Sequence, residues 1–238
     1  MSAMPTTAMV LAAGRGQRLS PITDTLPKPL VVVDGATMLD QAIDRLAAAG
    51  IARVVVNTHH LAERVHKHLE GRTAPEIVIS HETELLDTGG GVANALPHLG
   101  EAPFFVLNSD VIMLDGPKSA LLRLAETWCD ARMDALLLTN ATVRAHGYSG
   151  RGDFVLSPDG AVRRRREREI APYLFTGVQI FHPRLFANCP DGAFSLNWVY
   201  DKAAEAGRLY AIVHDGEWLH VGTPTALEHV EQTLAEIR

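Results

Sequence analysis

The chain has 238 residues, of which 47% are hydrophobic and 21% are charged, and its formal net charge is −6. This length corresponds to one large domain or two small ones, and we expect a single mixed α/β domain over residues 1–238. The net negative charge disfavours binding to nucleic acid through the phosphate backbone. No apolar run approaches the roughly 18 residues that a membrane span requires, so neither nucleic acid nor a membrane is expected as a partner.

The first 140 residues alternate short apolar runs with helical patterns. Five runs are typical of parallel strands that helices cover on both faces: residues 8–12, 53–57, 76–80, 104–108 and 135–139. Two helical stripes lie between the early runs, each closed by a glycine: Leu39, Ala42, Ile43 and Leu46 before Gly50, and Leu61, Val65 and Leu69 before Gly71. This alternation predicts a single doubly wound, mostly parallel mixed sheet flanked by helices, a Rossmann-like fold.

The pattern loosens after residue 140, where further strands are expected within residues 150–156, 173–181 and 208–213. A helix is expected to begin at Ser195, with its apolar stripe at Leu196, Val199, Tyr200 and Ala203. The last helix has Thr223 as its expected N-cap and Pro224 in its first turn. Its expected buried stripe is Leu227, Val230, Leu234 and Ile237.

The two cysteines and the N-terminus bear on the cellular compartment. Cys129 and Cys189 lie far apart and in no CxxC spacing, so neither a disulfide framework nor a thiolate zinc site is expected. A reducing, cytoplasmic location fits this pattern. No basic segment precedes the first apolar run, which leads directly into a glycine-rich turn, and we interpret that run as a strand instead of a cleaved signal.

The stretch from Leu11 to Pro29, LAAGRGQRLSPITDTLPKP, has the composition of a phosphate-binding loop. A dinucleotide fingerprint fails because Leu19 occupies the third glycine position, and the P-loop consensus does not occur in the chain. A longer loop remains, in which Arg15, Arg18 and Lys28 would neutralise a polyphosphate of about four negative charges together with a metal ion. The alternative is an ordinary tight turn with solvated cations.

Asp110 is a candidate metal ligand beside this loop. It follows the strand expected at residues 104–108, and Gly14 follows the strand expected at residues 8–12. Because ligands of doubly wound sheets bind outside the carboxyl ends of the strands, Gly14 and Asp110 should open onto one crevice. The alternative for Asp110 is an aspartate that caps the next turn.

The loop resembles the signature of the sugar-phosphate nucleotidyltransferase family, L-A-[AG]-G-x-G-x-R-[LM]-x-P-x-T followed by P-K-P. Other stretches follow in the order that these enzymes use: ETELLDTGGGVANAL, FFVLNSDV, GRGDF, FTGVQIFHP and WLHVGT. Within the family this combination is most similar to the N-acetylmuramate-1-phosphate uridylyltransferases of cell-wall and peptidoglycan recycling. The resemblance implies an enzyme that condenses a sugar 1-phosphate, best N-acetylmuramate 1-phosphate, with UTP to give a UDP-sugar and pyrophosphate.

The resemblance also implies a division of labour, with residues 1 to about 112 binding the nucleotide and residues from about 113 to 238 binding the sugar phosphate. Arg18, Lys28 and Asp110 would act in catalysis, with Asp110 binding Mg²⁺. The implied nucleotide-binding residues are Leu11, Ala12, Ala13, Gly14, Arg15, Gly16, Arg18, Lys28, Thr88, Gly89, Gly90 and Asn108. The residues from Thr88 to Gly91 would approach the base, where a β-carbon would obstruct it. The implied sugar-phosphate-binding residues are Gly150, Gly152, Asp153, Thr176, Gly177, Asn197 and His220.

One position departs from the family pattern. Relatives usually carry Asp in W-[LVI]-D-x-G-T, whereas this chain has His220. Magnesium prefers hard oxygen ligands, so His220 is a poor replacement. Either the metal depends on Asp110, water and ligand phosphates, or Asn197 or Asp215 takes the missing place. His220 would then contact the sugar phosphate or serve as a structural histidine.

Two further sets of residues have simpler interpretations. The run from Arg163 to Arg166 is expected to be a solvated loop, and contact with a substrate anion such as a lactyl carboxylate is the lesser alternative. The chain lacks the E-K-P string of relatives that act on glucose or mannose phosphates, which disfavours a plain hexose. Four histidines lack acidic or sulfur partners at ligand spacing and are expected on helix surfaces: His59, His60, His66 and His68.

Other functions stay open at this point. Sibling enzymes are a mannose-1-phosphate guanylyltransferase, a glucose-1-phosphate uridylyl- or thymidylyltransferase, and a phosphocholine cytidylyltransferase. A function of another class is a catalytically silent regulatory subunit that senses sugar phosphates, which His220 would favour and the loop cations disfavour. The oligomeric state is open between monomer and dimer.

Overall fold

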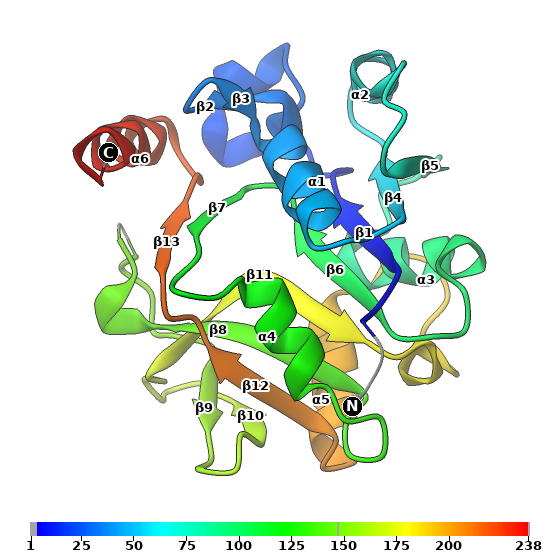
Figure 1. Cartoon of the computed structure of the whole chain (residues 1–238), viewed down its shortest axis with the longest axis vertical. Helices are drawn as coiled ribbons and strands as arrows, with labels where there is room; N and C mark the ends of the chain where they lie inside the picture. The colour runs from blue at the N-terminus through cyan, green and yellow to red at the C-terminus, as the bar shows by residue number, and fades with distance from the viewer. Residues whose placement is uncertain (1–3, 147, 238) are drawn as a thin grey trace.

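A computed structural model describes residues 4–146 and 148–237 of the chain. Its centre is a nine-stranded sheet (Figure 1). The strands of this sheet are β1 (Thr7–Leu11), β4 (Arg53–Thr58), β5 (Glu76–His81), β6 (Phe104–Asn108), β8 (Ala135–Ala141), β9 (Phe154–Leu156), β10 (Val162–Arg164), β11 (Tyr173–Phe181) and β12 (Leu209–Val213). They lie in the order β10-β9-β11-β6-β1-β4-β5, and β8 pairs with both β11 and β12.

Most strands of this sheet run in one direction. β1 pairs in parallel with β4 and β6, β4 pairs in parallel with β5, and β8 pairs in parallel with β12. β11 is antiparallel to β6, β8 and β9, and β10 is antiparallel to β9. The fold class expected from the sequence, a mostly parallel mixed sheet flanked by helices, is therefore confirmed.

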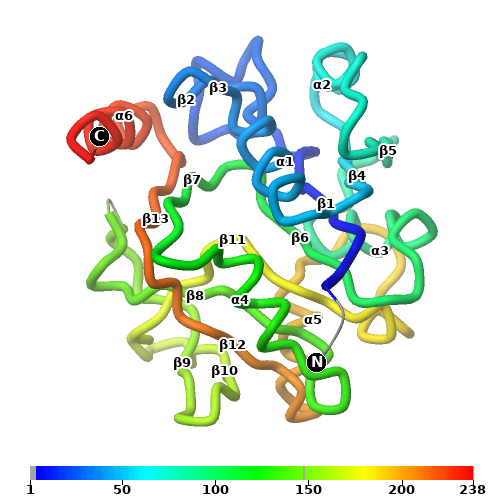
Figure 2. Tube along the Cα trace, viewed as in Figure 1, coloured from blue at the N-terminus to red at the C-terminus, as the bar shows by residue number. Residues whose placement is uncertain are grey.

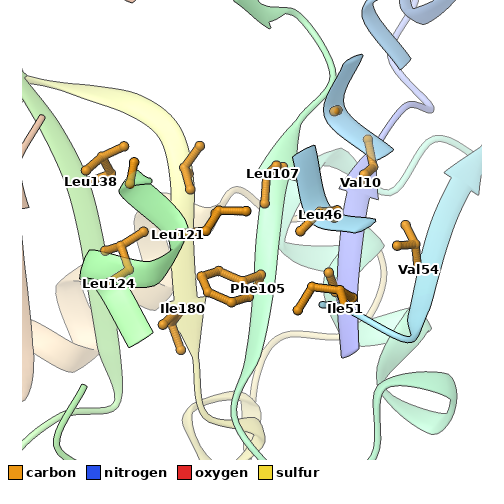
Figure 3. Packing of buried hydrophobic residues seen from close by; sticks show 14 of the residues in the cluster. Val10, Leu46, Ile51, Val54, Phe105, Leu107, Leu121, Leu124, Leu138 and Ile180 are labelled. Carbon is orange, nitrogen blue, oxygen red and sulfur yellow. The ribbon is translucent and has the colours of Figure 1, made fainter. Parts of the chain in front are cut away.

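Helices cover both faces of the sheet. On one face lie α1 (Met38–Ala48), α2 (Ala62–Leu69) and α4 (Ala120–Thr127), and on the other lie α3 (Asp87–Leu99) and α5 (Leu196–Glu205). Figure 1 shows α1 and α4 on the side facing the viewer. The strand β6 separates the two cores because successive side chains alternate between faces. Figure 3 shows Phe105 and Leu107 among the residues of α1 and α4, whereas Phe104 and Val106 pack on the α3 and α5 side.

Short elements complete the molecule around the carboxyl ends of the central strands. β2 (Val32–Val33) pairs with β3 (Ala36–Thr37), and β7 (Val111–Leu114) pairs antiparallel with β13 (Glu217–His220). The C-terminal helix α6 (Pro224–Ile237) returns to the N-terminal part of the chain (Figure 2), where Val230 packs with Val33 and Leu219. Short 3₁₀ turns are η1 (Gln17–Leu19), η2 (Ile22–Asp24), η3 (Lys28–Leu30), η4 (Thr142–Arg144) and η5 (Pro183–Phe186).

Several elements confirm the sequence-based expectations. The run at residues 173–181 is β11, and the five early runs are β1, β4, β5, β6 and β8 within a few residues. Ser195 caps α5 by accepting the N–H of Asn197 at 3.2 Å, and the hydroxyl of Thr223 accepts the N–H of Ala226 at 3.2 Å. No helix in the described ranges is both long and apolar enough to cross a membrane.

Several local expectations are wrong. His59 and His60 precede α2 instead of lying on a helix, and His68 lies 2.8 Å from the carboxylate of Asp40. β5 is an edge strand whose side chains are mostly half-buried, so it is not covered on both faces. Leu61 precedes α2 with a φ of 52°, and the buried stripe of that helix is Ala62, Val65 and Leu69. Ile237 is 51% exposed at the end of α6 and is not part of its buried stripe.

Candidate active site

The glycine-rich loop begins where a series of buried hydrogen bonds fixes the end of β1. The N–H of Ala12 donates to the Asn57 side-chain oxygen at 2.7 Å, and the Asn57 amide donates to Glu82 at 2.7 Å. The second oxygen of Glu82 accepts the N–H of Leu86 at 3.0 Å. Burial makes an unpaired polar group costly, so this series of hydrogen bonds holds β1, β4 and the entrance to α3 in one arrangement. Sequence reasoning missed Asn57 and Glu82, although each lies at or just past the end of a strand.

Gly16 allows the loop to fold back onto Lys28. Its φ is +62°, and a β-carbon there would lie 2.8 Å from the β-carbon of Lys28. The hydroxyl of Thr23 donates to the carbonyl oxygen of Gly16 at 3.0 Å, which secures the turn. A larger residue at position 16 would therefore be strained by its backbone and displace Lys28.

Lys28 and Asp110 form an ion pair between the loop and the end of β6. The Lys28 ammonium donates to Asp110 Oδ2 at 2.6 Å, and the side chains are 12% and 23% exposed. Arg15 and Arg18 are exposed and have no acidic partner among the described residues. Three cations and one carboxylate thus meet where the two strands end.

A pocket of about 770 Å³ opens at this place. It brings together many of the residues proposed for the nucleotide: Leu11, Ala12, Gly14, Arg15, Gly16, Arg18, Lys28, Thr88, Asn108 and Asp110. Residues of the same pocket that sequence reasoning missed are Gln17, Pro29, Leu85 and Ser109. Ala13, Gly89 and Gly90 are buried and do not line it.

The glycines of α3 have a different physical role from the one expected. A β-carbon on Gly89 would lie 2.5 Å from the Phe194 ring, and one on Gly90 would lie 2.3 Å from the carbonyl oxygen of Gly192. A β-carbon on Gly91 would meet Asn57 and Glu82 at 2.8 Å. The missing side chains therefore make room for other parts of the protein, and the approach of this segment to a base stays a prediction.

A second pocket of about 230 Å³ shares Arg18, Asn108 and Asp110 with the first. Four residues expected to bind a sugar phosphate line it: Asp153, Thr176, Gly177 and His220. Residues there that sequence reasoning missed are Val111, Tyr148, Leu174 and Trp218. The Thr176 side chain instead turns inward and donates to the carbonyl oxygen of Leu138 at 2.8 Å, so the side chain itself is committed to the core.

Gly150 and Gly152 do not line this pocket. Gly150 is exposed. Gly152 is buried with a φ of +70°, and its N–H donates to the Tyr148 hydroxyl at 3.0 Å. These two glycines therefore shape the loop that carries Tyr148 and Asp153, and their contact with a sugar phosphate stays a prediction.

A third pocket of about 550 Å³ adjoins the second through Asp153 and Phe175. Its other lining residues are Phe154, Arg164, Arg165, Glu167, Asn197 and Tyr200. Asn197 therefore lies in a different pocket from Asp110. The expectation that Asn197 could complete a metal site beside Asp110 is not supported by this placement.

His220 lies between the loop cations and the core. Its ring stacks on Trp218 with centroids 5.7 Å apart and planes 5° apart. Burial lowers the pKa of His220, and the nearby Asp110 raises it by less. Asp215, the other candidate to replace the missing aspartate, pairs with Arg123 at 2.7 Å near Gly116, at the opposite end of the β7–β13 pair from His220. Asp215 is therefore wrong as a metal ligand at this site.

The donor set fits a magnesium ion that the substrate helps to hold. The described residues contain no cluster of three or more His, Cys, Asp or Glu side chains able to bind a metal. Asp110 offers a carboxylate and Asn108 an amide oxygen in the same pocket, and both are hard ligands. Mg²⁺ is commonly bound by one or two carboxylates plus substrate phosphates, and the side chains of Asp110 and Asn108 fit that pattern.

A doubly wound sheet with a cationic pocket at the carboxyl ends of β1 and β6 defines an α/β nucleotide-binding enzyme. The chain belongs to the nucleotidyl transferase family, which it matches over residues 7–237. It is 43% identical over 241 residues to an N-acetylmuramate alpha-1-phosphate uridylyltransferase of Caulobacter vibrioides, covering 99% of this chain and 100% of the relative. An enzyme of the same description from Neisseria meningitidis is 34% identical, covering 94% and 96% of the two chains.

The fold is shared with solved structures of low sequence identity. A UDP-glucose pyrophosphorylase complexed with UDP-glucose superimposes with a TM-score of 0.81 at 15% identity, covering 99% of this chain and 100% of that chain. An inositol-1-phosphate CTP transferase from T. maritima gives a TM-score of 0.79 at 17% identity, covering 100% and 98% of the two chains. These likenesses confirm the fold.

Proposed function

We propose that this chain is a sugar-1-phosphate nucleotidyltransferase that joins UTP to N-acetylmuramate 1-phosphate and releases pyrophosphate. The observation that carries the proposal is the Lys28–Asp110 pair, in which Lys28 lines the larger pocket and Asp110 lines both the larger and the smaller one. The nucleotide would occupy the former and the sugar phosphate the latter, so the reacting groups would meet at this pair. The identities of 43% and 34% to uridylyltransferases support the base and the sugar.

The reaction needs no general base. The attacking oxygen belongs to a phosphate whose second pKa is about 6, so it is ionised at neutral pH. This oxygen forms a bond to the α-phosphorus of UTP, the bond from that phosphorus to the bridging oxygen breaks, and the electron pair leaves with pyrophosphate. The protein must therefore bring two anions into line and stabilise the charge on the phosphoryl oxygens.

The loop cations suit this task. Lys28 would contact the α-phosphate from a backbone that Pro27 and Pro29 restrict, which lowers the cost of ordering its side chain. Arg15 and Arg18 would bind the leaving phosphates, since their guanidinium groups have no acidic partner among the described residues. Enzymes of this family generally depend on a metal, and Mg²⁺ held by Asp110 would supply neutralising positive charge.

Two finer points belong to the same proposal. Residues 1 to about 112 would supply the nucleotide half and the rest of the chain the sugar-phosphate half of one domain. We place the enzyme in the cytoplasm, because Cys129 and Cys189 are both free thiols and a reducing compartment keeps them so. We place it in the recycling of peptidoglycan because the relatives that support the sugar are N-acetylmuramate uridylyltransferases.

The test is pyrophosphate release from the purified chain with Mg²⁺, each of the four nucleoside triphosphates and a panel of sugar 1-phosphates. We expect UTP with N-acetylmuramate 1-phosphate to give the highest kcat/KM. GTP with mannose 1-phosphate as the best pair would assign a sibling activity instead. Silence with every pair would support the regulatory alternative that His220 favours.

A further inference from the structure

Arg165 is a cation that the proposed mechanism does not use. The run Arg163–Arg166 is expected from the sequence to be a solvated loop, with contact to a substrate anion as the lesser alternative. In the structure Arg163 and Arg164 belong to β10, and the members of the run differ in their partners. Arg163 pairs with Glu169 at 2.6 Å, and Arg164 pairs with Asp201 at 2.6 Å. Arg165 has no acidic partner among the described residues and lines the third pocket.

The backbone and side chain of Arg165 are held in place. Its N–H donates to the carbonyl oxygen of Asp153 at 2.8 Å, which joins it to the segment that lines the second pocket. Its Nη1 donates to the carbonyl oxygens of Glu167 at 3.1 Å and Arg166 at 3.3 Å. A guanidinium has five N–H donors, so this anchoring leaves donors for a ligand and reduces the entropy lost on binding.

The charges of the third pocket leave Arg165 as its available cation. The lining acids are Asp153, which accepts the N–H of Phe175 at 2.9 Å, and Glu167, which is exposed. Arg164 lines the pocket too, but Asp201 already neutralises it. An anionic group in the pocket would therefore find its counter-charge at Arg165.

The position of the pocket indicates what that anion is. Asp153 and Phe175 line both the second and the third pocket, so a sugar in the second would direct a substituent into the third. N-acetylmuramate carries a lactyl ether that ends in a carboxylate, and N-acetylglucosamine is the same sugar without that group. A planar guanidinium binds a carboxylate through two parallel hydrogen bonds.

We propose that Arg165 is a specificity-determining residue that binds a carboxylate carried by the sugar, so that the third pocket selects an acidic sugar 1-phosphate over its neutral parent. This inference rests on the proposed function and extends it to the substituent that is recognised. Because the carboxylate is remote from the reacting phosphorus, the contact contributes to substrate binding and acts mainly on KM.

The experiment compares Arg165→Gln and Arg165→Lys with the wild-type enzyme, using UTP with N-acetylmuramate 1-phosphate or N-acetylglucosamine 1-phosphate. We expect Arg165→Gln to lower kcat/KM for the acidic sugar about 10- to 100-fold, mostly through KM, with less than about a twofold change for the neutral sugar. Arg165→Lys keeps the positive charge but lacks the two parallel N–H donors of a guanidinium, so it should lose less kcat/KM for the acidic sugar than Arg165→Gln. Added salt should weaken the discrimination of the wild-type enzyme.

Arg166→Gln is the matched control, because Arg166 is exposed, lies outside the pocket and has the same charge. An equal loss of kcat/KM for the acidic sugar in this variant would show that any positive charge of the loop has the same effect, and it would overturn the inference. Equal losses for both sugars in Arg165→Gln would show a structural role of the loop and overturn it too. If the wild-type enzyme turns over the acidic sugar and Arg165→Gln does so equally well, the inference is contradicted and the proposed function is not. If the wild-type enzyme is inactive on that sugar, the proposed function is contradicted as well.

Discussion

Lys28 illustrates how one side chain depends on distant residues. Its Nζ pairs with Asp110, which is 82 positions away. Its β-carbon would lie 2.8 Å from a β-carbon placed on Gly16. The sequence indicated a cation here from the P-K-P string and an aspartate after a strand. The distance of 2.6 Å between the two groups could not be predicted, because it depends on β1 and β6 pairing in parallel.

Replacing Lys28 with alanine tests its role at the residue scale. If Lys28 stabilises charge that develops on the α-phosphate, Lys28→Ala should lower kcat about 10²- to 10³-fold and change the KM for UTP by only a few-fold. Steady-state kinetics of pyrophosphate release would measure both constants. Lys118→Ala is the control, since Lys118 forms an exposed pair with Glu126. An unchanged kcat in Lys28→Ala would refute the assignment.

The element that most shapes the site is β11. Its pairing with β8 shifts register between Phe175 and Gln179, and Gly177 lies inside this bulge with a φ of +90°. A β-carbon on Gly177 would come within 2.9 Å of Val111 Cγ2 and 3.1 Å of Asn108 Cβ. The bulge therefore lets β11 approach the end of β6, where Asn108 and Asp110 lie.

Gly177→Ala should destabilise the protein more than an ordinary substitution of a glycine with positive φ. Gly207 is the matched control, because its φ is +65° and a β-carbon there would meet nothing within 4 Å. We expect Gly207→Ala to cost about 1 kcal/mol, and Gly177→Ala to cost a further 1–3 kcal/mol or so from overpacking. Urea unfolding gives both values, and equal costs would show that the bulge tolerates a β-carbon.

At the scale of the whole molecule, His214 joins the small β7–β13 sheet to the large one. Its backbone N–H donates to Thr139 of β8 at 2.7 Å, and its Nε2 lies 3.1 Å from the carbonyl oxygen of Leu114 and 3.2 Å from that of Glu217. The ring is buried, and its Nδ1 has no hydrogen-bond partner in the described part of the chain. Burial therefore lowers the pKa of His214.

This burial predicts a loss of stability in mild acid. The unfolded chain binds a proton at His214 near the ordinary pKa of about 6.5, whereas the folded chain resists protonation until a lower pH. The stability that the neutral His214 contributes is fully present above about pH 6.5 and is lost as the pH falls through the pKa of His214 in the folded chain. His214→Gln should therefore show a smaller drop in the free energy of unfolding between pH 7.5 and 5.5 than the wild type. Urea unfolding at the two pH values measures this, and identical drops would contradict it.

The sequence by itself indicated the strands of the central sheet except β10, the cations of the loop and the family, because hydrophobic period, turn residues and a fixed spacing of cations are local signals. The sequence also predicted that Gly14 and Asp110 open onto one crevice, whereas the tertiary structure decided the other contacts of the site. It placed β11 antiparallel between β6 and β8, and it packed Phe194 and Gly192 against the glycines of α3. It also brought His220 beside Asp110 through the pairing of β7 with β13. It also left Arg165 without an acidic partner among the described residues, while Arg163 pairs with Glu169 and Arg164 with Asp201. Such outcomes depend on contacts between segments far apart in the chain, and no local pattern encodes them.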